Sequence, residues 1–356
     1  MQGLTASAFQ KFRQNYLGMA SVIFIIFVGF VSIFAYVLAP DATQYANQMH
    51  LSIHSKPPGF SVQMLVQPNP NKILQNQFDK IFFGSKFPDK QQPISNYRIE
   101  TEQLIYTPYE AKNIQGIQQS IDYSKNPRAF VENKTFYLGT DNYGRDVLSR
   151  LLVGARISFF IGFVAVFISL IIGLFLGSIS GYFGGKIDSA IMFLINVTWS
   201  IPTLLLVIAI TLALGKGFWQ VFIAVGLTMW VEVARVVRGQ VLSVKQMQYV
   251  TAARSLGFTD YRIITKHILP NIMAPVIIIS AANFAGAILI ESGLSFLGIG
   301  AQPPMPSWGG IIKDHYSYIV LGKPYLAVIP GLAIMSLVTA FMLVGNALRD
   351  ALDVKN

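Results

Sequence analysis

The sequence predicts an all-α polytopic membrane protein with six transmembrane helices and one long segment outside the membrane. First, 53% of the residues are hydrophobic and only 12% are charged, about half the charged share of a typical soluble domain. Second, apolar stretches recur at about the 20-residue length that a helix needs to cross a bilayer. Third, only 41–142 has a composition typical of soluble proteins. These features exclude an ordinary soluble enzyme and a disordered or fibrous chain.

The first span is Met19–Leu38, which carries no charge. Because two basic residues precede it, a cleaved signal peptide is the alternative interpretation. The apolar run exceeds the usual h-region of about 7–15 residues, and Pro40 follows the best cleavage point, after Ala39. We therefore expect 1–40 to hold an N-terminal cytoplasmic segment and an uncleaved first transmembrane helix.

The remaining apolar stretches predict five more spans: Ile157–Gly185, Ser189–Leu214, Phe218–Val233, Ile272–Leu289 and Tyr325–Ala347. Pro202 lies inside Ser189–Leu214, the third span of the chain, and a proline there should kink or break the helix near Ser200. Six spans place both termini on one side of the membrane. Most lysines and arginines of the short connecting segments lie on that same side, so the positive-inside rule predicts cytoplasmic termini. The net charge of +10 is explained in the same way, without nucleic acid.

The segment 41–142 is expected to be an extracytoplasmic insert between the first two helices. Tyr97–Glu102 shows the period-two pattern of a strand, and Ser61–Val66 shows it more weakly. An exported cap or spacer is the favoured interpretation, and a docking surface for an extracellular partner is the alternative. His50 and His54 have a spacing that could bind a metal on a helix. No third ligand is evident, so we expect no metal site.

A polar motif precedes the second span. Asp141–Gly144 has the composition of a turn, and an amphipathic helix should begin near Arg145. We expect this helix to lie in the membrane interface, with Arg150 and Arg156 extending to the lipid headgroups. The residues of this interfacial motif are Gly139, Thr140, Asp141, Gly144, Arg145 and Asp146.

The last external loop, 295–324, is rich in proline. Trp308 suits an aromatic anchor at the membrane interface. Ser307 is placed to cap a short helix that extends through Ile312.

The inside loop 241–271 has a strongly helical pattern although it is too polar to span. Lys245–Leu256 should form one short helix, which Gly257 can end in the left-handed conformation. Thr259 can cap a second helix, with Asp260 in its first turn.

The loop has two further features. Pro270 should mark the turn back into the membrane. The small residues Ala252 and Ala253 would let another surface approach the first helix closely. An amphipathic loop resting on lipid headgroups is the simpler alternative.

Three blocks carry a resemblance to a known family. The run from Tyr249 to Gly257, followed by Ile263-Ile264 and by His267 to Asn271, looks like the cytoplasmic EAA loop of ABC-importer permeases. Leu138 to Arg150 and Gly293 to Gly309 resemble the corresponding blocks of oligopeptide, dipeptide and nickel permeases, and Leu348 to Asp353 also fits. The order of the blocks resembles the C-type permease subunit of these systems.

The resemblance implies the type-I ABC importer permease fold. Residues 143–348 would form the transmembrane permease domain, with 241–271 as its coupling loop, and 349–356 would be a cytoplasmic tail. The subunit would sit in the bacterial inner membrane as half of a path for oligopeptides or, second, dipeptides; nickel or another small solute is an alternative. Its implied partners are a second, different permease chain, two ABC ATPases, an extracytoplasmic substrate-binding protein and membrane lipid.

The resemblance also assigns a coupling role to loop residues that would contact an ATPase: Tyr249, Thr251, Ala252, Ala253, Arg254, Leu256, Gly257 and Asp260. Thr251 stands where the family has a glutamate, so the ion pair of that glutamate would be missing. A hydroxyl can still hydrogen-bond, and we therefore expect weakened or rerouted coupling.

The chain is expected to be a transporter subunit and not an enzyme, with no catalytic residue and no bound cofactor. ATP and Mg would be bound by the partner ATPases. The nearest matches to a phosphate-binding loop, Gly185-Lys186-Ile187 and Gly215-Lys216-Gly217, lack the required hydroxyl.

Two other classes of membrane protein fit the sequence less well. An ion-coupled secondary transporter would need ionisable groups in mid-membrane. Glu232 falls near the inner end of the fourth predicted span and Glu291 near the outer end of the fifth, so we expect both at interfaces or facing the bundle. The two halves of the chain show no inverted repeat. A membrane-anchored enzyme or sensor is the third class, but no serine–histidine–acid arrangement can be identified.

Overall fold

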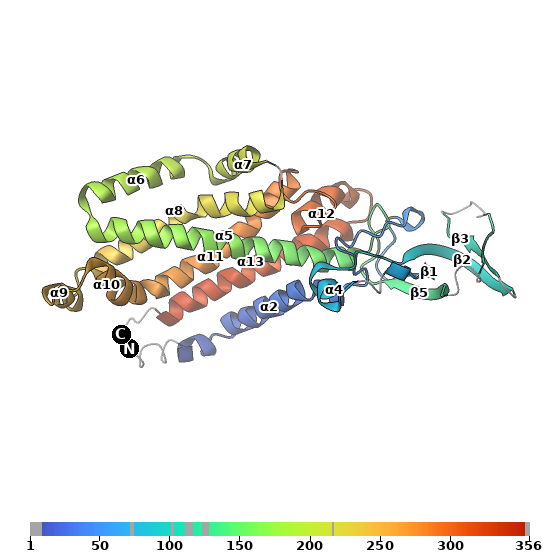
Figure 1. Cartoon of the computed structure of the whole chain (residues 1–356), viewed down its shortest axis with the longest axis horizontal. Coiled ribbons are helices and arrows are strands. Elements are labelled where there is room, and N and C mark those ends of the chain that lie inside the picture. Colours follow the sequence, from blue (N-terminus) through green and yellow to red (C-terminus); the bar gives the residue numbers. More distant parts are fainter. Residues whose placement is uncertain are drawn as a thin grey trace. The chain divides into compact units, whose positions relative to one another are not determined.

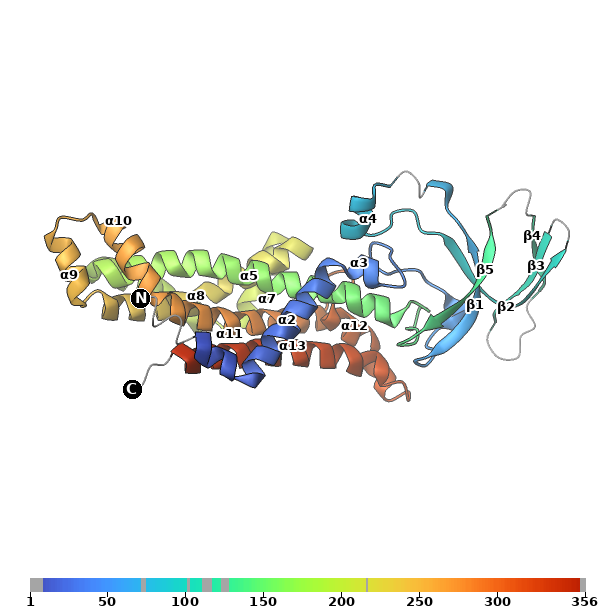
Figure 2. The same ribbon diagram turned by 90° about the horizontal axis from the view of Figure 1, so that it is seen from below.

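The computed structural model of the chain describes residues 9–71, 75–100, 103–110, 117–122, 128–215 and 217–352. The chain divides into two compact units. The first contains Ser158–Gln302 together with the chain up to Val28 and from Leu332 onward. The second contains Gly29–Ile157 and Pro303–Gly331. Figures 1 and 2 show that the first unit is helical and that the second contains a sheet.

Long apolar helices account for the predicted spans. Five are long and apolar enough to cross a membrane, and a sixth is obtained if the bent pair α6–α7 counts as one broken span. The helices that form or extend into the first unit are α2 (Tyr16–Ile33), α5 (Val147–Phe183), α6 (Gly185–Ser200), α7 (Thr203–Leu214), α8 (Phe218–Val244), α9 (Gln248–Ser255), α10 (Asp260–Arg262), α11 (Leu269–Phe296) and α13 (Tyr325–Leu352).

The break predicted at Pro202 is confirmed. The helix axis turns by 93° between α6 and α7, and Figure 1 shows the two helices pointing in different directions. Pro202 lies immediately before α7, where its missing N–H costs no intrahelical hydrogen bond.

Helix α8 is longer than the hydropathy predicts. It continues to Val244 instead of ending at Val233, because the basic residues that end the apolar stretch find partners. Arg238 forms a two-pronged ion pair with Asp188 on α6, with Nε–Oδ1 and Nη2–Oδ2 distances of 2.6 and 2.7 Å. Glu232 therefore lies in the middle of the helix, although it was predicted near the inner end of the apolar span.

Close contact between α5 and α8 depends on glycines. A Cβ added at Gly173, Gly177 or Gly181 would lie 2.5–2.8 Å from an atom of α8. Small residues at four-residue spacing let helix backbones approach within a membrane, where packing drives association. The sequence analysis did not identify this spacing.

The second unit is built around a five-stranded antiparallel sheet in the order β4-β3-β2-β1-β5. Both strand predictions are confirmed for the described residues; Thr101 and Glu102 lie outside them. The strands are β1 (Phe60–Gln67), β2 (Lys90–Glu100), β3 (Gln103–Pro108), β4 (Gln119–Asp122) and β5 (Phe130–Phe136). Short helices accompany them: α3 (Ala35–Leu38), η1 (Leu51–Ile53), α4 (Gln77–Phe83), α12 (Trp308–His315) and η4 (Tyr316–Ile319).

Alternating side chains of β1 pack on opposite faces of the sheet. Met64 and Val66 pack with Phe136 on one face, and Leu65 packs with Ile94 and Leu104 on the other. A strand buried on both sides explains why its sequence shows only weak alternation.

The proline-rich stretch 303–324 folds into the second unit. The Trp308 indole Nε1 donates to the Leu151 carbonyl at 2.9 Å, and the Tyr325 hydroxyl donates to the Lys56 carbonyl at 2.7 Å. Ser307 caps α12 as predicted, accepting from the Gly310 N–H at 3.1 Å. Trp308 is only 4% exposed, so the prediction of an interfacial anchor was wrong: a protein carbonyl, and not the lipid interface, satisfies its N–H.

Candidate functional site

The loop 241–271 has the predicted helix–glycine–helix structure. Helix α9 begins at Gln248, three residues later than predicted, and Gly257 has φ of +76°. The Phe258 N–H donates to the Ala253 carbonyl at 3.2 Å and the Gly257 N–H to the Arg254 carbonyl at 3.0 Å, which is a Schellman ending. The Thr259 hydroxyl accepts from the Arg262 N–H at 3.4 Å, so the predicted cap of α10 is confirmed.

The predicted turn at Pro270 was wrong. Pro270 lies within the first turn of α11, and helical structure runs from Asp260 to Phe296. A π-helical segment, Ile263–Ile268, joins α10 to α11. At the start of a helix a proline's missing N–H is tolerated, so the chain continues without turning.

The two faces of α9 differ sharply. Val250 and Ala253 are buried in a core cluster with residues of α5, α8 and α11. The opposite face carries most of the residues to which a coupling role was assigned, and these are exposed: Tyr249, Thr251, Ala252, Arg254, Leu256 and Gly257, together with Asp260 on α10. The expectation that both alanines admit another surface was wrong for Ala253, which is 4% exposed. It is small because it packs against the chain's own helices.

Tyr182, at the end of α5, joins both arms of the loop to the helices. Its hydroxyl donates to Asp260 Oδ1 at 2.5 Å, and its carbonyl accepts from Lys245 Nζ at 2.6 Å. The Arg254 guanidinium lies 5.5 Å from its ring centre. The sequence analysis missed this residue, although a tyrosine near the end of an apolar helix is typical of membrane interfaces.

The residues of the interfacial motif come together as a buried polar network in the second unit. Asp141 Oδ1 accepts from the Tyr143 and Arg145 N–H groups at 2.8 and 2.9 Å, and its Oδ2 accepts from Arg145 Nε at 2.6 Å. Asp146 Oδ2 accepts from the Ser149 N–H at 2.9 Å and so caps α5. This network fixes the chain where the helix begins.

Thr140 and the two glycines of the motif join it to the segment near His50. The Thr140 hydroxyl donates to the Ile53 carbonyl at 2.5 Å. Gly139 and Gly144 have φ of +78° and +72°, and a Cβ on them would lie 2.4 Å from the Lys56 carbonyl oxygen and 1.9 Å from the His50 carbonyl oxygen. The backbone must pass this closely, which only glycine allows.

The expectation that Arg150 reaches lipid headgroups was wrong. Its side chain is 5% exposed, and its Nε lies 3.7 Å from Asp141 Oδ2. The buried carboxylate of Asp141 offsets the cost of burying the guanidinium. Arg156 is half-buried, with its guanidinium 5.2 Å from the ring centre of Tyr36.

His50 gives the second unit a pH dependence. Burial, together with the nearby charge of Lys134, lowers the pKa of His50 to about 4, and the charge of Asp41 opposes part of this shift. Because the folded state resists protonation, the stability that neutral His50 allows is present above pH 6.5 and is lost as the pH falls toward 4. We expect acidification over this window to destabilise the unit by about 2–3 kcal/mol.

Thermal unfolding of the wild type and of His50→Gln at pH 7 and pH 4.5 measures this effect. The glutamine variant should lose less stability on acidification. Burial raises the pKa of Asp146, which acts in the opposite direction in both proteins and cancels in the comparison. Equal losses in the two proteins would contradict the assignment.

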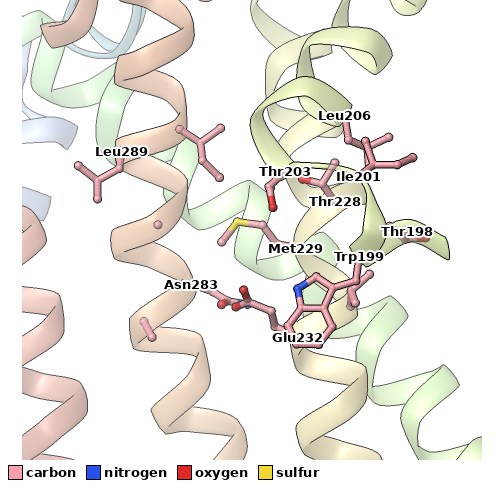
Figure 3. Close-up of a pocket in the computed structure, with 14 residues that line it drawn as sticks. Thr198, Trp199, Ile201, Thr203, Leu206, Thr228, Met229, Glu232, Asn283 and Leu289 are labelled. Carbon is pink, nitrogen blue, oxygen red and sulfur yellow. The ribbon is translucent and has the colours of Figure 1, made fainter. Parts of the chain in front are cut away.

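A cavity of about 380 Å³ lies among α6, α7, α8 and α11 in the first unit. Its polar lining, drawn in Figure 3, consists of Thr198, Trp199, Thr203, Thr228, Glu232 and Asn283. The break at Pro202 places Thr198 and Thr203 on the same wall. The Arg235 guanidinium lies 3.5 Å from the ring centre of Trp199 and holds that side chain in place. Sequence reasoning singled out Glu232 as an ionisable residue but assigned it to no cavity, and it identified none of the other lining residues, since helices that lie far apart in the chain build the wall.

Taken together, apolar membrane-crossing helices, an exposed helix–glycine–helix loop fixed to them and a polar cavity between them define a membrane transport permease. The chain belongs to the family described as binding-protein-dependent transport system inner membrane components, which it matches over residues 173–355. Residues 3–58 match the N-terminal transmembrane domain of oligopeptide transport permease C.

Known proteins are similar over most of their length. The glutathione transport system permease protein GsiD of Pectobacterium atrosepticum is 39% identical over 248 residues, which cover 70% of this chain and 79% of that protein. The dipeptide transport system permease protein DppC of Bacillus subtilis is 42% identical over 219 residues, covering 62% and 68%. A solved structure of the MetNI methionine ABC transporter, in an inward-facing conformation, is 19% identical, covers 57% of this chain and 96% of that chain, and has a TM-score of 0.47.

These similarities confirm the predicted family. The chain is a permease of the peptide-type ABC importer family. It is accordingly a transporter subunit, and its family is located in the bacterial inner membrane.

Proposed function

We propose that this chain is the C-type subunit of an ATP-driven importer and forms half of a translocation path for peptides. Oligopeptides are the first choice of substrate and dipeptides the second. The names of the similar permeases, which refer to dipeptide and to glutathione, support a short peptide over nickel or another small solute. A different permease chain forms the other half of the path, and an extracytoplasmic binding protein delivers the substrate.

Two partner ATPases, which bind ATP and Mg, supply the energy. The observation that carries this proposal is the exposed face of α9, because it leaves Thr251, Ala252 and Leu256 free to enter a cleft on an ATPase. The small side chain of Ala252 allows close approach, and the Thr251 hydroxyl offers a hydrogen bond in place of the ion pair of a glutamate.

Motion then passes from the loop into the helices by direct contact. A push on α9 acts on Val250 and Ala253, which pack against α8 and α11. The hydrogen bond from Tyr182 to Asp260 carries the same push into α5. The close packing of α5 on α8 makes these helices respond together.

The proposed orientation follows from charge. The loop 241–271 and both termini face the cytoplasm, where the ATPases are, because basic residues collect on that side. The insert 41–142 then faces outward, on the side of the binding protein.

Reconstitution tests the proposed function. Proteoliposomes that contain both permeases and the ATPases, with the binding protein added outside, should take up labelled peptide only when hydrolysable ATP is inside. An ionophore that collapses proton and sodium gradients should leave this uptake unchanged. Uptake that requires an ion gradient and not ATP would contradict the proposal, and nickel uptake without peptide uptake would reassign the substrate.

A further inference from the structure

Glu232 occupies an unusual position for a charged residue. It lies in the middle of α8, its side chain is exposed, and it lines the cavity. An ionised carboxylate on a membrane-spanning helix is costly where it faces lipid, and such residues generally face water, protein or a transported solute. No ion pair is formed by Glu232 within the described ranges. The nearby Arg235 instead donates to Asn196 Oδ1 at 2.8 Å and stacks on Trp199.

Asn283, on α11, is the second polar group of interest. It is 1% exposed, and its Nδ2 has no hydrogen-bond partner among the residues that the structure describes. Figure 3 shows Glu232 and Asn283 projecting into the space between α8 and α11. A buried amide donor without a partner is costly, so this position favours a ligand that brings an acceptor.

The two groups match the chemistry at one end of a peptide. A carboxylate accepts charge-assisted hydrogen bonds from an ammonium group, and an amide Nδ2 donates to a carbonyl. In a free peptide the N-terminal ammonium and the first carbonyl are separated by a single carbon atom. The cavity volume of about 380 Å³ falls in the range of small-molecule sites.

We propose that Glu232 and Asn283 form a contact site for the N-terminal ammonium and first carbonyl of a peptide in transit, which rests on the proposed function. The site recognises what all free peptides share and leaves side-chain selection to other components. The site therefore requires a solute with a free N-terminal ammonium group. A solute with a blocked N-terminus loses the contact with the Glu232 carboxylate.

Uptake by the reconstituted complex is the first test. With the binding protein saturating, Glu232→Gln should lower uptake of labelled dialanine at least about tenfold, as expected for loss of a charge-assisted contact. Uptake of N-acetyl-dialanine should change by less than about twofold. Glu132→Gln, which removes an exposed carboxylate from β5, is the matched control and should leave both rates unchanged.

Cysteine labelling provides a second measurement that does not depend on transport. The chain has no cysteine, so Glu232→Cys introduces its single thiol. A sulfonated methanethiosulfonate should modify this thiol in the assembled complex, and dialanine should slow the modification where N-acetyl-dialanine does not. Ile223→Cys, on the same helix with a wild-type exposure of 40% and outside the cavity, should show no protection by either peptide.

The outcomes separate the two proposals. Equal loss of uptake for both peptides in Glu232→Gln, loss of its association with the partner permease, or absence of dialanine protection would overturn the contact site. If the wild-type complex does not transport the acetylated peptide, the cysteine-labelling result alone tests the contact site. A wild-type complex that takes up no peptide at all would instead refute the proposed function.

Discussion

Ala252→Trp is expected to abolish ATP-driven peptide uptake while the chain stays folded in the membrane. Ala252 is exposed on the outward face of α9, where an indole would hold an approaching ATPase away from the helix. Loss of one well-packed contact at the centre of an interface commonly costs at least about 2 kcal/mol, so uptake should fall more than about tenfold. Uptake by proteoliposomes and a pull-down of the ATPases measure the two consequences.

Two further variants show whether the loss of uptake in Ala252→Trp is caused by the position of the substitution or only by the bulk of the indole. Tyr261→Trp replaces one large exposed aromatic with another in the same loop and should transport normally. Ala253→Trp should fail differently, because its indole would enter the cluster that α9 shares with α8 and α11, and overpacking destabilises the chain itself. Normal uptake by Ala252→Trp would count against the coupling role of α9.

Gly144→Ala is expected to destabilise the second unit by about 3–5 kcal/mol, since a backbone clash adds to conformational strain. The added Cβ would lie 1.9 Å from the His50 carbonyl oxygen, and the residue has φ of +72°. Gly59→Ala is the control, because Gly59 has φ of +80° but no atom within 4 Å of its added Cβ. The control should lose only the strain of about 1–2 kcal/mol.

The stability loss of both variants is measured by unfolding in detergent, with limited proteolysis of the insert as the readout. A loss in Gly144→Ala no larger than in Gly59→Ala would show that the chain relaxes around the added methyl group. The packing of the interfacial motif against the His50 segment would then be looser than the structure describes.

Hydropathy and local capping rules predicted much of the fold. The spans, the break at Pro202 and the ending of α9 at Gly257 depend on side chains close together in the sequence. The prediction for Gly257 succeeded because a left-handed helix ending is a property of the residue itself. Two of the five strands, β1 and β2, followed from their short-range alternation in the same way, whereas β3, β4 and β5 were not predicted.

The errors share a different cause, which is contact between distant segments. Arg150 and Trp308 have side chains typical of a membrane interface, yet each finds a buried partner, Asp141 and the Leu151 carbonyl respectively. The extension of α8 depends on Asp188, which neutralises Arg238 from another helix. Local composition carries no signal for such pairs, and it identified neither the cavity nor the inward position of Ala253.

The joint folding of 29–157 with 303–331 also constrains protein engineering. In a hybrid permease that received only the foreign residues 41–142, these residues would have to pack against the unmatched native stretch 303–331. Tyr325 would then lose its acceptor, the Lys56 carbonyl, or meet an altered one. Exchange of this region between related transporters should therefore succeed only when the two stretches are transplanted as a pair.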